Sequence, residues 1–129
     1  MLETELATLA VQARKMAYAP YSGFLVGAAL LTKGGQIYTG VNIENAAFSP
    51  TNCAERTAFF CAVSHGERNF DAVAVAGWKE GQPGFAFPCG VCRQVMMEFC
   101  RPDAFRIFVT DGKELKTFLL DELLPFGFR

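Results

Sequence analysis

The sequence predicts one α/β domain in which helices cover both faces of a mixed, five-stranded sheet, a three-layer α-β-α arrangement. Two observations lead to this prediction. Segments of helical and strand periodicity follow one another in the order α-β-β-α-β-α-β-β. The first two strands are joined by a tight turn, as in an antiparallel hairpin, whereas later strands are separated by helices, as in parallel crossovers. The length fits one domain over residues 1–129.

The chain opens with a helix and a hairpin. Apolar residues recur at helical spacing over residues 3–17, and Pro20 ends that pattern because the residue before a proline avoids helical backbone angles. Apolar segments then predict strands over 25–32 and 36–41, and the Lys33-Gly34-Gly35 segment between them suits a hairpin turn. This hairpin supplies two antiparallel neighbours of the sheet.

Two helix–strand steps follow the hairpin. Thr51 and Asn52 are good N-caps for the first helix, and Pro102 lies just past the end of the second. The expected elements are a helix at 53–65, a strand at 71–77, a helix at 89–100, strands at 106–110 and 114–119, and a helical turn at 120–124. Because each helix begins where a strand ends, both helix starts should lie at one edge of the sheet and face a shared crevice.

Charge and hydropathy exclude several classes of partner. The formal net charge is -1 and no basic cluster is present, so neither nucleic acid nor an anionic membrane is expected to bind. The longest apolar runs, such as 24–31, are far shorter than a membrane span, and the acidic opening Met1-Leu2-Glu3 is unlike a signal peptide. We therefore expect a cytoplasmic protein. Thirteen phenylalanines exceed what a monomer of this size buries easily, which favours a subunit interface.

Five cysteines, an odd number without an export signal, argue against a disulfide framework and favour metal ligands or core thiols. Cys89 and Cys92 lie three residues apart at the start of a helix, so their side chains share one face. Cys53 opens the other helix at the same edge of the sheet and can supply a third thiolate to a tetrahedral zinc ion. Cys61 and Cys100 lie two turns away from these positions and are expected to be core thiols.

The rest of the predicted site follows from what a zinc ion needs. The single histidine, His65, lies about 18 Å along the helix from Cys53 and cannot complete the site. Three protein ligands with one open position are typical of a catalytic zinc, whereas a structural zinc is closed by a fourth ligand. Glu55 does not share the helix face of Cys53, so it is a poor ligand but a suitable proton carrier beside the open position. Three thiolates and Zn²⁺ sum to -1, and Arg56 and Arg93 are candidates to compensate this charge by bonding to sulfur.

Two other interpretations of the cysteines remain open at this point. Cys89 and Cys92 alone match the spacing of a thioredoxin-like redox pair. The cysteines could also hold zinc in a non-catalytic assembly module, with the phenylalanines making contacts between chains. Glu55 favours a catalytic zinc over both of these interpretations, because a structural site has no use for a carboxylate beside an open ligand position.

Four motifs resemble the small, homotetrameric, zinc-dependent cytidine deaminases. They are PYSGFLVGAAL at 20–30, GVNIENAAFSPTNCAERTA at 40–58, PCGVCRQ at 88–94 and LLPFGF at 123–128. Several motifs in order extend the resemblance over nearly the whole chain. The CAE and PCGVC segments match the zinc deaminase signature, in which a glutamate acts without binding the metal. Phe48 departs from the pattern, since some relatives have a tyrosine there.

The resemblance implies a set of functional residues. One zinc ion per chain would be held by Cys53, Cys89 and Cys92, and Glu55 would carry protons. The substrate would be bound by five further residues, which are Phe24 against the pyrimidine, the Ala54 backbone against the base, Asn42 and Glu44 against the ribose, and Phe128 reaching into a neighbouring subunit's site.

The resemblance also implies a reaction, the hydrolytic deamination of cytidine and deoxycytidine to uridine and deoxyuridine with release of ammonia, a step of pyrimidine salvage. Water activated by zinc would attack C4 of the cytosine, and Glu55 would protonate N3 and then the departing ammonia. No redox cofactor is needed. The alternative within the same chemistry is deamination of another aminopyrimidine nucleoside such as blasticidin S, although Asn42 and Glu44 together favour a ribose and hence cytidine.

Overall fold

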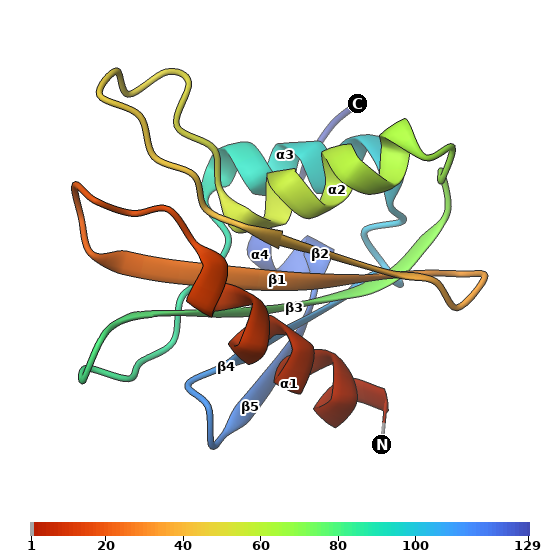
Figure 1. Ribbon diagram of the computed structural model, residues 1–129. Coiled ribbons are helices and arrows are strands. Elements are labelled where there is room, and N and C mark those ends of the chain that lie inside the picture. Colours follow the sequence, from red (N-terminus) through yellow and green to blue (C-terminus); the bar gives the residue numbers. More distant parts are fainter. Residues whose placement is uncertain (1) are drawn as a thin grey trace.

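The computed structural model describes residues 2–129 and contains the mixed five-stranded sheet that the sequence predicts (Figure 1). The strands lie in the order β2-β1-β3-β4-β5. β1 is antiparallel to both of its neighbours, β3 and β4 are parallel, and β5 is antiparallel to β4. The strand bounds are Phe24–Thr32 for β1, Ile37–Val41 for β2, Phe70–Lys79 for β3, Arg106–Thr110 for β4 and Leu115–Leu119 for β5.

Helices cover both faces of this sheet. α1 packs on one face, and α2 and α3 lie side by side on the other (Figure 1). Alternate residues of β1 serve the two layers: Ala28 and Leu30 belong to the core under α2 and α3, whereas Ala29 and Leu31 belong to the core under α1. The helix bounds are Leu2–Ala13 for α1, Ala54–Ser64 for α2, Gly90–Phe99 for α3 and Leu120–Leu123 for α4. The predicted three-layer α-β-α fold is confirmed.

The first helix is shorter than its apolar pattern suggested. α1 ends at Ala13, and a single 3-10 turn over Arg14–Met16 follows it. Arg14 lies at this change of winding. Its side chain is buried and donates to the carbonyl oxygens of Leu25 at 3.2 Å and Trp78 at 2.7 Å. This guanidinium joins the end of the helix to β1 and β3, and the helix has ended well before Pro20.

The N-cap of α2 is Cys53, and the prediction that Thr51 or Asn52 caps this helix is wrong. The Thr51 hydroxyl accepts a hydrogen bond from the backbone N–H of Asn45, and the Asn52 amide donates to the Thr57 hydroxyl. Thr51 therefore braces the loop before the helix, and Asn52 joins that loop to Thr57 of α2. The sulfur of Cys53 is thereby left at the helix start.

Three strands end at the same edge of the sheet. β2, β3 and β4 run in one direction, so their carboxyl ends lie together, and β1 begins there at Phe24 because it runs the opposite way. α2 follows the end of β2, and α3 follows the end of β3. Gly40 lets α2 lie directly on β2, since a Cβ atom at Gly40 would be 2.5 Å from the Ala54 oxygen. Both helix starts therefore lie at this edge, as the sequence predicts.

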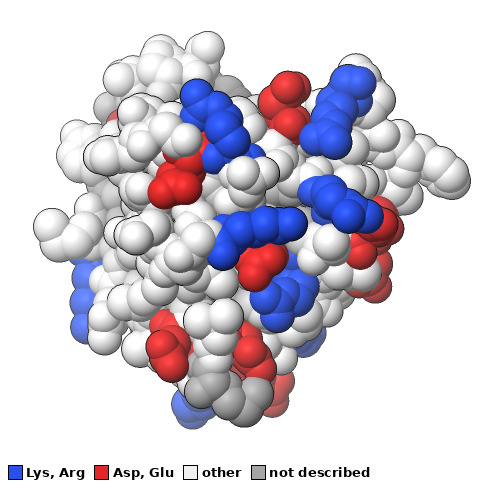
Figure 2. Space-filling model, turned by 90° about the vertical axis from the view of Figure 1, so that its right-hand side faces the viewer, with Lys and Arg blue, Asp and Glu red and all other residues white. Residues whose placement is uncertain are grey.

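Two surface properties bear on the excluded partners. No helix within residues 2–129 combines the length and apolar character that a membrane span requires. On the face drawn in Figure 2, Lys and Arg side chains are interspersed with Asp and Glu. That face carries no single-sign patch of the kind that binds nucleic acid.

Candidate active site

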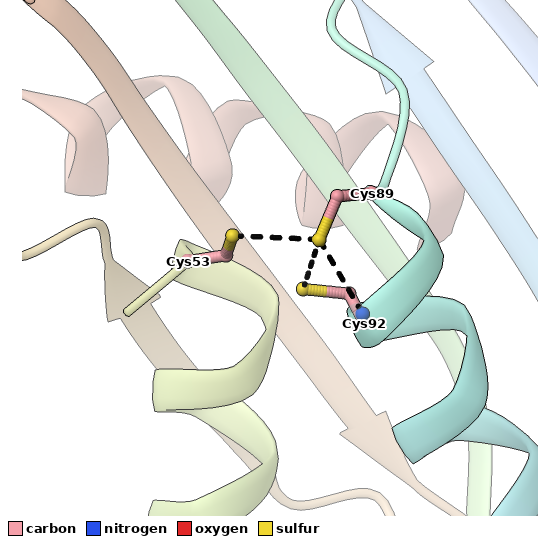
Figure 3. A group of neighbouring side chains, drawn as sticks. All are labelled: Cys53, Cys89 and Cys92. Carbon is pink, nitrogen blue, oxygen red and sulfur yellow. Dashed lines mark hydrogen bonds between the residues drawn. The ribbon is translucent and has the colours of Figure 1, made fainter. Parts of the chain in front are cut away.

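Three sulfur atoms converge at the edge where α2 and α3 begin (Figure 3). Cys53 is the N-cap of α2, Cys89 is the N-cap of α3, and Cys92 lies in the first turn of α3. The Sγ atoms of Cys53 and Cys89 are 3.6 Å apart, and those of Cys89 and Cys92 are 3.5 Å apart. All three lie within 4.8 Å of one another. The structure thus brings together the three cysteines that the sequence singles out.

The sulfur cluster fits one zinc ion. Thiolates that bind zinc at about 2.3 Å in a tetrahedron lie about 3.8 Å apart, close to the separations found here. Among the residues that the structure describes, no other His, Cys, Asp or Glu joins the cluster. Three ligands and one open position can hold a metal ion that still accepts water or substrate.

The remaining thiols and the histidine lie away from the cluster, but the prediction that Cys61 is a core thiol is wrong, because it belongs to neither hydrophobic core. His65 is the C-cap of α2, at the opposite end from Cys53. Cys100 is buried, and burial raises the pKa of its thiol to about 12, which makes it an inert core residue. Cys61 is only partly buried, and its Sγ lies 3.9 Å from the Nδ1 atom of His65.

Positive charge surrounds the sulfurs. Arg56 Nη2 donates to Cys53 Sγ at 3.2 Å, and the backbone N–H of Cys92 points to Cys89 Sγ at 3.5 Å. The pKa of Cys53 is lowered to about 5, chiefly by the hydrogen bond from the Cys92 thiol, against the opposing effect of burial and with the help of Arg56. The pKa of Cys92 is raised, because its thiol donates to Cys53 and is buried. The hydrogen bonds to Cys53 therefore favour its thiolate, the form that binds metals.

Arg93, which was expected to bond to sulfur, makes its hydrogen bonds elsewhere. Its Nε donates to the carbonyl oxygen of Pro88 at 2.7 Å, and its Nη1 donates to the carbonyl oxygen of Leu123 in α4. Arg93 therefore orients the peptide that precedes Cys89 and joins it to α4. Of the two arginines, Arg56 is the one that donates to a thiolate.

Glu55 lies beside the sulfur cluster in the first turn of α2. Its side chain is almost fully buried, with 4% of the residue exposed. Burial, with a smaller contribution from Cys53, raises the pKa of the Glu55 carboxyl to about 7, against the opposing effects of a hydrogen bond from its own backbone N–H and of Arg56. A buried carboxyl with such a pKa can both accept and release a proton near neutral pH.

A cavity of about 170 Å³ contains the sulfurs of Cys53 and Cys89 together with Glu55. Four of the predicted substrate-binding residues, Phe24, Asn42, Glu44 and Ala54, also line it. The other lining residues are Val26, Thr51, Asn52, Val75, Ala86 and Phe87. Apolar walls with a few converging polar groups are typical of a small-molecule site.

Asn42 is held in place at the cavity by the first residues of β1, and Glu44 by the segment just before that strand. The Asn42 amide accepts from the Val26 N–H at 2.9 Å and donates to the Phe24 carbonyl at 2.8 Å. The Glu44 carboxylate accepts from the Tyr21 N–H and from both the N–H and the hydroxyl of Ser22. The Ser22 hydroxyl holds the pKa of Glu44 below its usual value. Glu44 is therefore a fixed anion at the cavity wall.

Three cysteine sulfurs and a buried carboxyl group thus lie together at two helix starts. The family model described as "Cytidine and deoxycytidylate deaminase zinc-binding region" matches residues 2–107, which include all three cysteines and Glu55. The chain belongs to this deaminase family. Zinc is accordingly its cofactor, and the three-cysteine cluster is the place in this deaminase that can hold one ion.

Relatives of this deaminase carry consistent names. The cytidine deaminase of Sporosarcina psychrophila is 52% identical over 118 residues, which cover 91% of this chain and 84% of the relative. That of Halalkalibacterium halodurans is 49% identical over 120 residues, covering 92% of this chain and 88% of the relative. The crystal structure of cytidine deaminase from Burkholderia pseudomallei matches 99% of this chain and 100% of its own with a TM-score of 0.90 and 43% identity. A blasticidin-S deaminase of Bacillus cereus is less similar, at 34% identity over 108 residues, 80% of this chain and 76% of the relative.

Two phenylalanines of the deaminase bear on the site, one that was not predicted and one, Phe128, that was predicted to reach a neighbouring subunit's site. Phe87 was not predicted, yet it lines the cavity and packs edge-on against Phe118 of β5, with ring centroids 5.6 Å apart. Its position next to PCGVC is the signal that could have indicated it. Within the described residues 2–129, Phe128 is not among those that line this cavity. It is 76% exposed, and its backbone carbonyl accepts a hydrogen bond from the Gln94 side chain. The structure does not bring Phe128 to the site of its own chain.

Proposed function

We propose that the chain catalyses the zinc-dependent, hydrolytic deamination of cytidine and deoxycytidine to uridine and deoxyuridine, with release of ammonia. One observation carries this proposal: two cysteines of the three-cysteine cluster, Cys53 and Cys89, line one small cavity together with the buried carboxyl of Glu55. The names of the relatives support the same substrate.

In the proposed site, Cys53, Cys89 and Cys92 hold one zinc ion per chain. When bound, zinc supplies an activated water at neutral pH. Arg56 offsets part of the negative charge that three thiolates bring, because it donates to Cys53. Without such compensation an electron-rich metal would acidify water less.

Glu55 carries the protons in the proposed reaction. Hydrolysis replaces the amino group at C4 of the base with oxygen from water, so a proton must leave the water and another must reach the departing nitrogen. Glu55 lies beside the sulfurs and is shielded from solvent. Its carboxylate can take one proton of the water and deliver it to N3, and then take the second proton from the hydroxyl group now on C4 and deliver it to the amino group, which leaves as ammonia.

The walls of the cavity suit a nucleoside. The Phe24 ring would pack on the pyrimidine, the Ala54 backbone would contact the base, and Asn42 and Glu44 would bond to the ribose hydroxyls. No Lys or Arg of the described residues lines the cavity, and Glu44 adds a negative charge to its wall. A substrate phosphate would therefore be unpaired and repelled, which favours nucleosides over nucleotides.

We further propose that the chain forms a homotetramer with shared active sites, in which Phe128 completes a neighbour's site. Its exposure away from its own cavity supports this, as do other exposed aromatic rings such as Phe48, which is 93% exposed. On the same family likeness, we propose that residues 1–129 form a single domain. We also propose that the protein acts in the cytoplasm, in pyrimidine salvage.

A panel of substrates tests the proposed function. The zinc-loaded protein is given cytidine, deoxycytidine, cytidine 5′-monophosphate and blasticidin S, and deamination is followed by the change in ultraviolet absorbance. Cytidine and deoxycytidine should be the preferred substrates, and the monophosphate a poor one. A preference for blasticidin S would instead favour the antibiotic as substrate. Stoichiometric zinc with no turnover of any compound would favour the non-catalytic assembly module.

A further inference from the structure

Gly77 of β3 lies directly beneath one wall of the cavity. It pairs with Val26 across the β1–β3 ladder. A Cβ atom at Gly77 would be 2.9 Å from Val26 Cγ2, 3.0 Å from Ala86 Cβ and 3.2 Å from the Phe24 ring. Its φ is not in the left-handed region, so space and not backbone conformation is what requires glycine here.

The three neighbours of Gly77 share one property: all of them line the cavity. Phe24 and Val26 come from β1, and Ala86 comes from the loop before Cys89. Gly77 itself does not line the cavity. Because Gly77 has no side chain, the Phe24 ring, the Val26 isopropyl group and the Ala86 methyl group can pack against one another above β3, although they come from two separate segments.

We infer that Gly77 is a positioning residue for the substrate, acting through Phe24, Val26 and Ala86. The inference rests on the proposed function, because the apolar wall that these three form is the proposed seat of the pyrimidine. The absence of a Cβ at Gly77 sets how deep that wall lies and hence the room for the base.

The three neighbours differ in how far they can yield to an added methyl group. The Val26 methyl is the end of a rotatable side chain, whereas the Ala86 Cβ is fixed to its backbone and the Phe24 ring is already in close contact. Displaced atoms on this wall have the open cavity on their free side. Gly77→Ala should therefore push the wall toward the substrate, without touching the sulfur cluster or Glu55, which are not among the nearest atoms.

The test is steady-state deamination of cytidine by Gly77→Ala, well below its melting temperature. A displacement of a few tenths of an ångström should raise KM about three- to tenfold, while kcat stays within about twofold. Zinc should remain at one ion per chain. In the double variant Gly77→Ala/Ala86→Gly the 3.0 Å contact is gone while those with Val26 and Phe24 remain, so KM should fall below that of Gly77→Ala but stay above that of Ala86→Gly alone.

Gly84→Ala is the matched control. It adds the same methyl group in the loop that carries Ala86, has an ordinary φ, and would meet no atom within 4 Å, so its KM should be that of the wild type. A variant that is merely less stable would lose melting temperature without any change in KM, and that result would overturn the inference.

The outcomes distinguish the inference from the proposed function. If wild-type protein does not deaminate cytidine, the proposed function fails and this inference fails with it. If the wild type is active and Gly77→Ala has an unchanged KM, only the inference is overturned. If Gly77→Ala does not fold, the double variant decides by comparison with Ala86→Gly alone: a KM at least about twofold above that of Ala86→Gly supports the inference, because Val26 and Phe24 are still displaced, and an equal KM overturns it.

Discussion

Replacing Gly40 with alanine should separate the two halves of the metal site. A Cβ atom at this position would be 2.5 Å from the Ala54 oxygen and closer still to the Ala58 nitrogen, both of them backbone atoms of α2. No change of rotamer can relieve a clash with backbone. Restoring an ordinary contact of about 3.4 Å requires α2 to retreat by 3.4 − 2.5, or about 0.9 Å.

That retreat acts on the site because α2 carries Cys53 and Glu55, whereas Cys89 and Cys92 belong to α3. The Cys53–Cys89 sulfur separation of 3.6 Å would widen by several tenths of an ångström. Metal–ligand distances tolerate only about 0.2 Å, so zinc should bind more weakly. A shift of nearly 1 Å in Glu55 should lower kcat about 10²-fold even at saturating zinc.

Gly27→Ala is the control for this prediction. A Cβ atom at Gly27 would be 2.5 Å from the Arg14 nitrogen, so the same methyl group pushes away the end of α1 on the opposite face of the sheet. Both variants should lose stability, but only Gly40→Ala should lose zinc affinity, measured by competition with a chromophoric chelator, and kcat. Wild-type zinc affinity in folded Gly40→Ala, or equal losses in both variants, would refute the reasoning.

Three more predictions follow from individual contacts. Arg56→Gln should weaken zinc binding by about 10–100-fold in the same chelator competition, because the donor to Cys53 is lost; unchanged affinity would remove Arg56 from metal binding. Co-expression of Glu55→Gln with Phe128→Ala should restore activity that neither variant has alone, if each site draws Glu55 and Phe128 from different subunits; absence of restoration in mixed tetramers would contradict the shared site. Asp111 accepts two backbone N–H bonds in the β4–β5 turn, which hold its pKa below the usual value. The ionised Asp111 carboxylate therefore stabilises the fold above about pH 4, and this stabilisation is lost as pH falls through its lowered pKa. Asp111→Ala should lower the melting temperature fully at pH 6 and by less at pH 3. A loss of melting temperature that does not depend on pH would argue against this role of Asp111.

The metal site could be predicted from the sequence because its geometry is local or follows from topology. Cys89 and Cys92 lie three apart at a helix start, and Cys53 opens a second helix after a strand that ends at the same edge. Only the order of strands and helices was needed to bring these segments together. Glu55 followed from the same argument, since it is the carboxylate nearest the open ligand position.

The substrate cavity could not be predicted in the same way. Phe24 begins an apolar strand and is indistinguishable from a core residue by periodicity, so its role came from family motifs alone. Arg93 donates to a carbonyl thirty residues away in α4, a partner that no local pattern reveals. Gly77 matters because three side chains from two segments meet above it, which only the tertiary structure specifies.

The N-cap of α2 shows a different limit. Thr51 and Asn52 are of the residue types that cap helices most often, but the Thr51 side chain is engaged within the preceding loop and the Asn52 side chain donates to the Thr57 hydroxyl in α2. A weak cap, Cys53, takes the position instead. Local preference gives way here to the placement of a sulfur at the helix start, where a metal ligand is required.

The most direct test of the account is ammonia release from cytidine by zinc-loaded wild-type protein and by Glu55→Gln, with zinc content measured in both. The account predicts one zinc per chain in each, ammonia from the wild type, and a loss of at least about 10²–10⁴-fold in the variant. Near-normal turnover in Glu55→Gln would contradict its role as the proton carrier. An active wild type without zinc would contradict the metal site itself.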